Sequence, residues 1–103
     1  MNAETAWYAT ARADNAIATA TKAAEANSKH VITSIYAAFG GASTKTLLIK
    51  EGVTTRITLD VVNSLALEGL ALEFAAGAAV SAELAASGSA GVNGSVLLNG
   101  YTK

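Results

Sequence analysis

The chain has 103 residues, 51% of them hydrophobic, and its seven basic and eight acidic side chains give a net charge of −1. This length allows one domain, and the charged residues form no basic stripe of the kind that binds nucleic acid. No apolar run approaches the roughly 18–20 residues that span a bilayer, and the absence of cysteine excludes disulfides and thiolate metal sites. We therefore expect a soluble intracellular product that binds neither nucleic acid nor membrane.

The first 27 residues are rich in alanine, and their pattern fits either a helix or a strand. Ile17 and Thr19 alternate with alanines, which favours a strand over Ala16–Ala23. The preceding segment, Met1–Asp14, shows no pairing partner in the pattern, so we expect an N-terminal arm outside the core. The predicted organisation is therefore an arm, residues 1–14, followed by a β-sandwich domain, residues 15–103.

Two longer strands are expected over His30–Phe39 and Val92–Tyr101. Both carry apolar residues on each face, such as Ile35 and Tyr36 in the first. A strand with one face in water does not need this pattern. We expect each strand to be buried on one side by the core and on the other by a neighbouring subunit.

The middle of the chain alternates apolar and polar residues. A strand over Thr46–Ile49 is expected to continue through a hairpin turn at Lys50–Val53 into a strand over Val53–Val61. A further strand is expected over Val80–Leu84. Turn signals recur at roughly 8–12-residue intervals, which is typical of an all-β sandwich or barrel. The residues expected to face inward are Val53, Ile57, Leu59, Val61, Val80, Ala82 and Leu84, and those expected to face solvent are Arg56, Asp60 and Glu83.

No catalytic constellation is visible. His30 is the only histidine, and its position beside Lys29 at the start of a strand suggests a surface residue. Glu68 and Glu73 lie in an apolar stretch and are the best candidates for a specific contact, an ion pair between subunits. Gly88–Gly91 lacks the spacing of a phosphate-binding loop. We expect no catalytic residue, no cofactor and no metal, and hence no enzyme.

Trp7, Tyr8 and Arg12 are the candidate partner-binding residues. Tryptophan, tyrosine and arginine are the residue types most enriched at binding hot spots. Their place in a short arm suggests that they dock onto another protein. The alternative, equally weighted, is that Trp7 folds back over the domain's own sandwich.

Several segments resemble small virion proteins encoded by tailed phages. In these proteins similar segments form a compact jelly-roll β-sandwich, often trimeric, that decorates a capsid or sits on a fibre. The similar segments, which extend over roughly Ala16–Thr102, are AIATATKAA at 16–24, HVITSIYAAF at 30–39, KTLLIKEG at 45–52, GAAVSAELAASGSAG at 77–91 and VLLNGYT at 96–102.

The resemblance implies a capsid decoration, or cement, protein on the phage head surface. Its expected partners are further copies of itself, as a homo-oligomer and most simply a trimer, and the major capsid protein, with Trp7, Tyr8 and Arg12 as the capsid contacts. The resemblance carries over no catalytic residue. The alternative is a receptor- or glycan-binding tip module of a tail fibre. Such a module usually needs aromatic and polar groups at a loop end, whereas the loops expected in this chain are rich in alanine, glycine and serine and almost free of aromatic residues.

Overall fold

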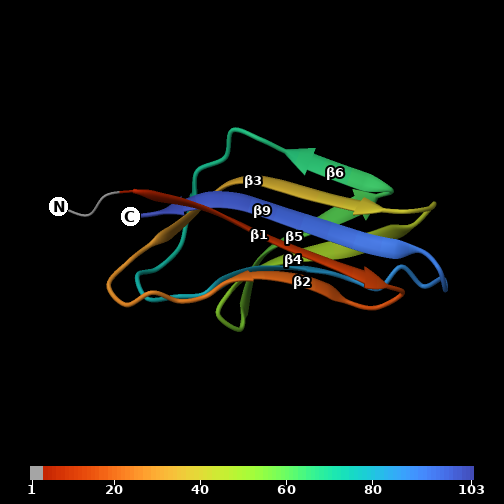
Figure 1. Ribbon diagram of the computed structural model, residues 1–103, viewed down its shortest axis with the longest axis horizontal. Coiled ribbons are helices and arrows are strands. Elements are labelled where there is room, and N and C mark those ends of the chain that lie inside the picture. Colours follow the sequence, from red (N-terminus) through yellow and green to blue (C-terminus); the bar gives the residue numbers. More distant parts are fainter. Residues whose placement is uncertain (1–3) are drawn as a thin grey trace.

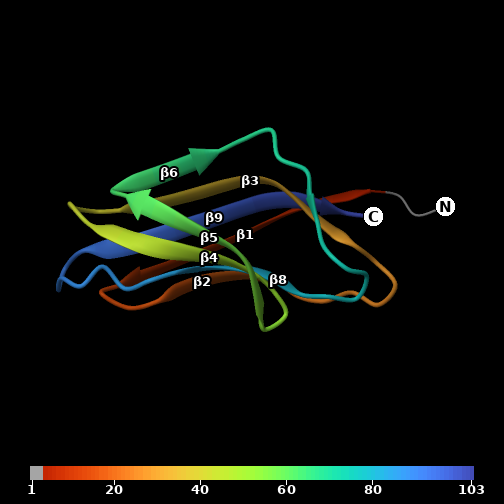
Figure 2. The same cartoon turned by 180° about the vertical axis from the view of Figure 1, so that it is seen from behind.

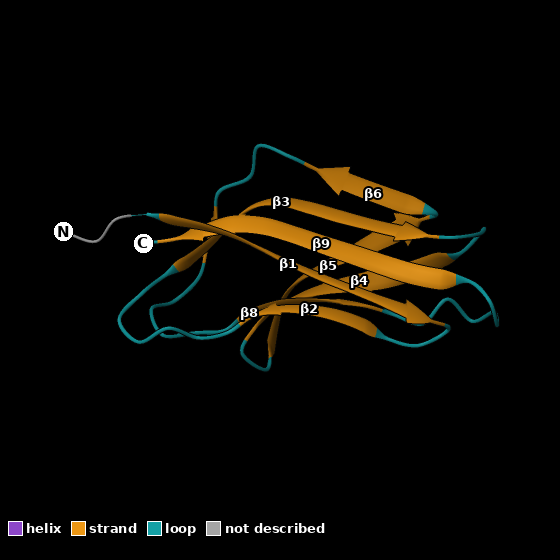
Figure 3. Ribbon diagram, viewed as in Figure 1, coloured by secondary structure: helices purple, strands orange, loops and turns teal. Residues whose placement is uncertain are grey.

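The computed structural model describes residues 4–103, which form strands joined by turns and loops (Figures 1 and 3). No helix long and apolar enough to cross a membrane occurs in this part of the chain. The strands are β1 Thr5–Asp14, β2 Ala18–Lys22, β3 His30–Phe39, β4 Thr44–Glu51, β5 Thr54–Val62, β6 Ser64–Leu67, β7 Leu72–Glu73, β8 Val80–Leu84 and β9 Asn93–Thr102.

The strands form two antiparallel layers that face each other (Figures 1 and 2). One layer has the order β1-β9-β3-β6 and the other β5-β4-β8-β2. A single residue pair, Val62 with Ser64, connects β5 to β6, and the short strand β7 adds to β3. The eight strands of the two layers, in this order, form a jelly roll. The prediction of an all-β, jelly-roll sandwich is confirmed.

The core lies between the layers and follows the predicted alternation. Val80 and Leu84 of β8 are fully buried, while Ile57 and Leu59 of β5 pack against the core from a partly buried position. The prediction that Val53 faces inward is wrong, because it lies at the tip of the β4–β5 hairpin and is 97% exposed. The buried hydrophobic residues of the core are Ala18, Ala20, Ile32, Ile35, Ala37, Phe39, Leu47, Ile49, Val61, Phe74, Val80, Ala82, Leu84, Val96 and Leu98.

The structure also corrects the predicted boundary at residue 14. Thr5–Asp14 is strand β1, which pairs with β9 along its whole length, from Thr5 opposite Thr102 to Asp14 opposite Asn93. The alternate residues Trp7, Ala9, Ala11 and Ala13 pack against the core. Alanine every second residue fits this edge of the sandwich because it lets the layers approach closely. The described part of the expected arm therefore belongs to the sandwich, and Met1–Ala3 lie outside the described residues.

Candidate interaction face

The outer face of the β1-β9-β3-β6 layer is the candidate site. Residues opposite each other in antiparallel strands point to the same side of a sheet. Thr10 lies opposite Leu97, Leu97 opposite Tyr36, and Tyr36 opposite Ala66. These four side chains therefore form one row across all four strands, on the face away from the core. We call this row and its neighbours the outer face of the first layer.

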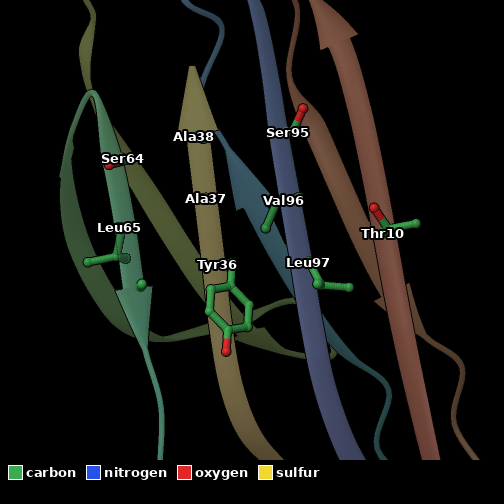
Figure 4. Close-up of a pocket in the computed structure, with 10 residues that line it drawn as sticks. Thr10, Tyr36, Ala37, Ala38, Ser64, Leu65, Ser95, Val96 and Leu97 are labelled. Carbon is green, nitrogen blue, oxygen red and sulfur yellow. The ribbon is translucent and has the colours of Figure 1, made fainter. Parts of the chain in front are cut away.

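Tyr36 and Leu97 sit at the centre of a shallow groove on this face (Figure 4). The groove has a volume of about 290 Å³. The side chains of Tyr36 and Leu97 are half-buried in the single chain. They lie on the side of β3 and β9 that the sequence predicted to be covered by a neighbouring subunit. The residues that line the groove are Thr10, Tyr36, Ala37, Ala38, Ser64, Leu65, Ala66, Ser95, Val96 and Leu97.

The row of side chains on each side of the central row has small or polar, uncharged residues in its middle. Tyr8, Asn99 and Ser34 share one row, in which the Asn99 side-chain amide donates to Ser34 Oγ at 2.9 Å. The row on the other side of the central row contains Ser95 and Ala38, and Arg12 lies at its β1 end. The middle of the outer face can therefore be covered without burying a charged group, the costliest step in forming an interface.

The outer face of the second layer differs in charge. Lys50 of β4 and Glu83 of β8 form a salt bridge there at 2.5 Å, and Asp60 of β5 is exposed. Charged residues are depleted in the centre of protein interfaces. The first layer's outer face is thus the better candidate for a partner.

The three candidate residues of the N-terminal segment point in two directions, because strand side chains alternate. Tyr8 is 72% exposed, and Arg12 is exposed on the same side. Trp7 points inward and packs against the core, with its ring edge-on to His30 at a centroid distance of 5.8 Å. Its Nε1 is buried without a hydrogen-bond partner among residues 4–103. The structure does not bring the three side chains together on one surface.

The prediction that His30 lies on the surface is wrong. The side chain is fully buried. Its Nε2 donates to the Ala23 carbonyl oxygen at 2.8 Å, and its Nδ1 shares a 2.7 Å hydrogen bond with Thr102 Oγ1. Both ring nitrogens therefore bond groups of the same chain, which fastens the loop after β2 to the end of β9.

Glu73 bonds within its own chain. Its carboxylate pairs with Lys29 at 3.5 Å and with Lys103 at 2.5 Å, and Glu68 is exposed. The hydrogen bond from Lys103 is the main reason that the pKa of Glu73 lies below its ordinary value, and the pKa of Lys103 is raised in return. Glu73 thus has two lysine partners in its own chain, and the ion pair between subunits stays a prediction.

A second groove, of about 380 Å³, lies beside the β4–β5 hairpin and the β7 segment. At its wall the Glu51 carboxylate pairs with Arg56 and accepts a hydrogen bond from the Ala75 amide at 2.7 Å. The Ala75 hydrogen bond, followed by that from Arg56, lowers the pKa of Glu51. Because these polar groups already bond one another, this groove is a weaker candidate than the outer face.

The Gly88–Gly91 turn is closed by side chains from the end of β1 and from the turn that follows it. The Gly88 amide donates to Asn15 Oδ1 at 2.9 Å, and the Gly91 amide donates to Asp14 Oδ1 at 2.8 Å. Amides that bind a phosphate must be free to donate to it. The amides of Gly88 and Gly91 already donate to side chains of the same chain, so this turn is not a phosphate-binding loop. Across residues 4–103 there is also no group of three or more histidine, cysteine, aspartate or glutamate residues placed to hold a metal ion.

Comparison with known proteins gives a fold likeness only. No family model and no curated protein sequence matches the chain. Among solved structures, the chain is similar to a chain from the acidic stable capsid structure of Helicobacter pylori bacteriophage KHP30, with a TM-score of 0.58 and 16% identity. The alignment covers 94% of this chain and 87% of the phage chain. At this identity the likeness shows a shared fold.

The sequence predicted that a neighbouring subunit covers the outer side of two strands of this face, but it did not show how the face is assembled. The apolar residues on both sides of His30–Phe39 and Val92–Tyr101 included Tyr36 and Leu97. What the pattern could not show is that β9 lies between β1 and β3. That order brings Thr10 beside Leu97.

Proposed function

We propose that this chain is a structural protein of a bacteriophage virion that decorates the head by binding the major capsid protein. It would act as a homo-oligomer, without catalysis and without a cofactor. Two observations support the proposal. The jelly-roll fold is similar to that of a chain in a phage capsid structure, and the outer face around Tyr36 and Leu97 is uncharged at its centre. From the second observation we infer which surface makes the contact.

The chemistry of this face suits a contact with a broad protein surface. The central row exposes an aromatic ring, a leucine, an alanine methyl group and a threonine in a line across four strands. Tyrosine combines a large apolar contact area with a hydroxyl group that can still hydrogen-bond. The polar rows beside it would form the rim that usually surrounds such a centre.

Tyr8 and Arg12 stay in the proposal as residues at the border of the face. Both are exposed on β1, on the same side as Thr10. Trp7 has a different role here, because its ring packs on His30 and on the core. It would contribute to binding by holding β1 in the sheet.

Self-association would strengthen an individually weak contact. A head surface repeats the same binding site at fixed spacings, so joined copies bind several sites at once. The second binding event is then intramolecular, and avidity can exceed the single-site affinity by about 10²–10⁴. A small domain that binds through a shallow groove can decorate a capsid in this way.

Labelling of intact virions with gold-conjugated antibodies against the protein tests the location. We expect gold over the head in electron micrographs, at many positions per particle. Labelling confined to the tail tip would contradict the proposal and favour the fibre-tip alternative. Absence of the protein from purified virions would contradict both.

A further inference from the structure

Strand β1 forms a free edge of the first layer. It is ten residues long, and among residues 4–103 its only ladder partner is β9. Exposed edges are usually blocked by proline, by lysine or by a bulge that twists the strand away. β1 contains neither proline nor lysine, its charged residues Arg12 and Asp14 lie in its last three positions, and its register with β9 runs without interruption. Such an edge can accept another strand.

The direction of the main-chain groups in β1 follows from the hydrogen bonds around it. In an antiparallel ladder, a residue points both its N–H and its C=O toward one neighbour. The Asn15 amide donates to the Val92 carbonyl oxygen at 3.2 Å, which continues the β1–β9 register by one pair. The odd-numbered residues of β1 therefore bond β9, and the even-numbered ones direct their amides and carbonyls to the free edge.

The hydrogen bonds between β9 and β3 independently show which residues of β9 bond β1. Lys29 and Lys103 exchange two main-chain hydrogen bonds at 2.9 Å, and the Gly40 amide donates to the Asn93 carbonyl oxygen at 2.8 Å. The odd-numbered positions of β9 thus bond β3. Its even-numbered positions are left for β1, where Gly100 lies opposite Trp7.

We propose that the free edge of β1 pairs antiparallel with β1 of a second copy, with Thr10 opposite Thr10 across a twofold axis. Pairing by hydrogen bonds must join even-numbered residues to even-numbered residues, so the twofold axis passes through a residue position. With Thr10 on the axis, Tyr8 lies opposite Arg12 of the second copy, and a guanidinium over a tyrosine ring is attractive. The nine residues Ala6–Asp14 of each strand would exchange roughly ten main-chain hydrogen bonds.

The neighbouring registers are less favourable. With the axis at Ala9, Glu4 would lie opposite Asp14 of the second copy, and like charges directly opposite each other are destabilising. With the axis at Ala11, the strands overlap over fewer residues and the contact between Tyr8 and Arg12 is lost. Of these three registers, only the one centred on Thr10 places Tyr8 opposite Arg12 of the second copy while keeping an overlap of nine residues.

This contact extends the proposed function, but it does not depend on where the protein binds. Two paired copies would form one continuous eight-stranded layer, because each contributes the four strands β1, β9, β3 and β6. Both Tyr36–Leu97 grooves would then open on the same surface. The symmetry of the proposed contact is twofold, whereas the sequence suggested a threefold ring.

Sedimentation equilibrium of the purified chain tests the contact without any phage component. The wild-type protein is expected at twice its chain mass of 10.3 kDa. Tyr8→Arg would place like charges opposite each other, and we expect dimerisation at least about ten-fold weaker. Adding Arg12→Glu to Tyr8→Arg exchanges the repulsion for an ion pair and should restore the dimer. Thr58→Arg, on exposed β5 of the other layer, is the matched control and should leave the mass unchanged.

Thr10→Pro provides a second test that does not rely on charge. The Thr10 amide points to the free edge, so proline removes a donor for the second copy and none for β9. We expect a folded monomer, with the circular dichroism spectrum of the wild type. A wild-type monomer or trimer, a dimer unaffected by Thr10→Pro, or a double variant that stays monomeric would each overturn the proposal. Because no phage head is involved, these outcomes leave the proposed head binding to be judged separately.

Discussion

Gly100 of β9 lies opposite Trp7 of β1, and a Cβ atom on residue 100 would come within 2.7 Å of Trp7 Cζ2. The same atom would overlap the Val31 carbonyl oxygen on the other side. Glycine is therefore required at this position by close packing. The indole ring covers the glycine on one side and meets the buried His30 ring edge-on. Trp7 thus fastens β1 to the sandwich.

Gly100→Ala should consequently destabilise the protein by about 1–3 kcal/mol, the usual cost of overpacking a tight site. The Val31 obstacle is main chain and cannot turn aside as a flexible side chain would. Gly40→Ala is the matched control, because a Cβ there meets Asn93 only at 3.8 Å. Urea unfolding followed by tryptophan fluorescence measures both. Equal midpoints for the two variants would contradict the packing described for Trp7.

His30→Ala is expected to cost about 2–5 kcal/mol, since it removes a buried ring and leaves the Ala23 carbonyl and the Thr102 hydroxyl without their partner. Thr102→Val keeps the shape of the side chain and removes one hydrogen bond, so about 1–3 kcal/mol is expected. Ser89→Ala, in an exposed turn, serves as the control, and the free energy of unfolding in urea is measured for all three. A His30→Ala variant as stable as the control would support the surface position that the sequence suggested.

Stability should fall in acid partly through Glu51 and Glu73. Hydrogen bonds from the Ala75 amide and Arg56 hold the pKa of Glu51 below its ordinary value of 4.5, and Lys103 followed by Lys29 does the same for Glu73. A carboxylate whose pKa is lower in the folded state stabilises the fold above pH 4.5, and this contribution is lost as the pH falls through the folded pKa.

Glu51→Gln combined with Glu73→Gln should therefore flatten the dependence of the unfolding free energy on pH below about 4.5. Urea unfolding at a series of pH values from about 7 to about 3 measures this slope. Glu68→Gln removes an exposed carboxylate and is the control. A double variant with the same slope as the wild type would show that neither ion pair survives in solution.

The strands that sequence reasoning placed well are those with strong contrast between neighbouring residues. His30–Phe39 and Val80–Leu84 agree with the structure to the residue. Strand β1 lacks this contrast, because its inward side chains after Trp7 are alanines. Alanine suits a helix, a strand or a tail almost equally, and the pairing partner of Thr5 is Thr102, at the far end of the chain.

The candidate site was harder to predict than the fold for a related reason. His30 is held by Thr102, 72 residues away, and only the tertiary structure shows that a polar residue at a strand end is buried there. The outer face is assembled from β1, β9, β3 and β6, which come from both ends and the middle of the chain. Residue type suggested Tyr8 and Arg12 as partner-binding groups, and both are exposed, while the alternation of side chains along β1 turns Trp7 inward.

Occupancy of phage heads by added protein tests the central proposal most directly. Purified heads lacking the protein would be mixed with labelled wild type, Leu97→Asp or Thr58→Asp, each first shown to be folded. A charge at Leu97 would have to be buried in the contact, so we expect Leu97→Asp to bind at least about ten-fold less, while Thr58→Asp on the opposite layer binds like the wild type. Full occupancy by Leu97→Asp would contradict the account and move the binding surface away from the Tyr36–Leu97 groove.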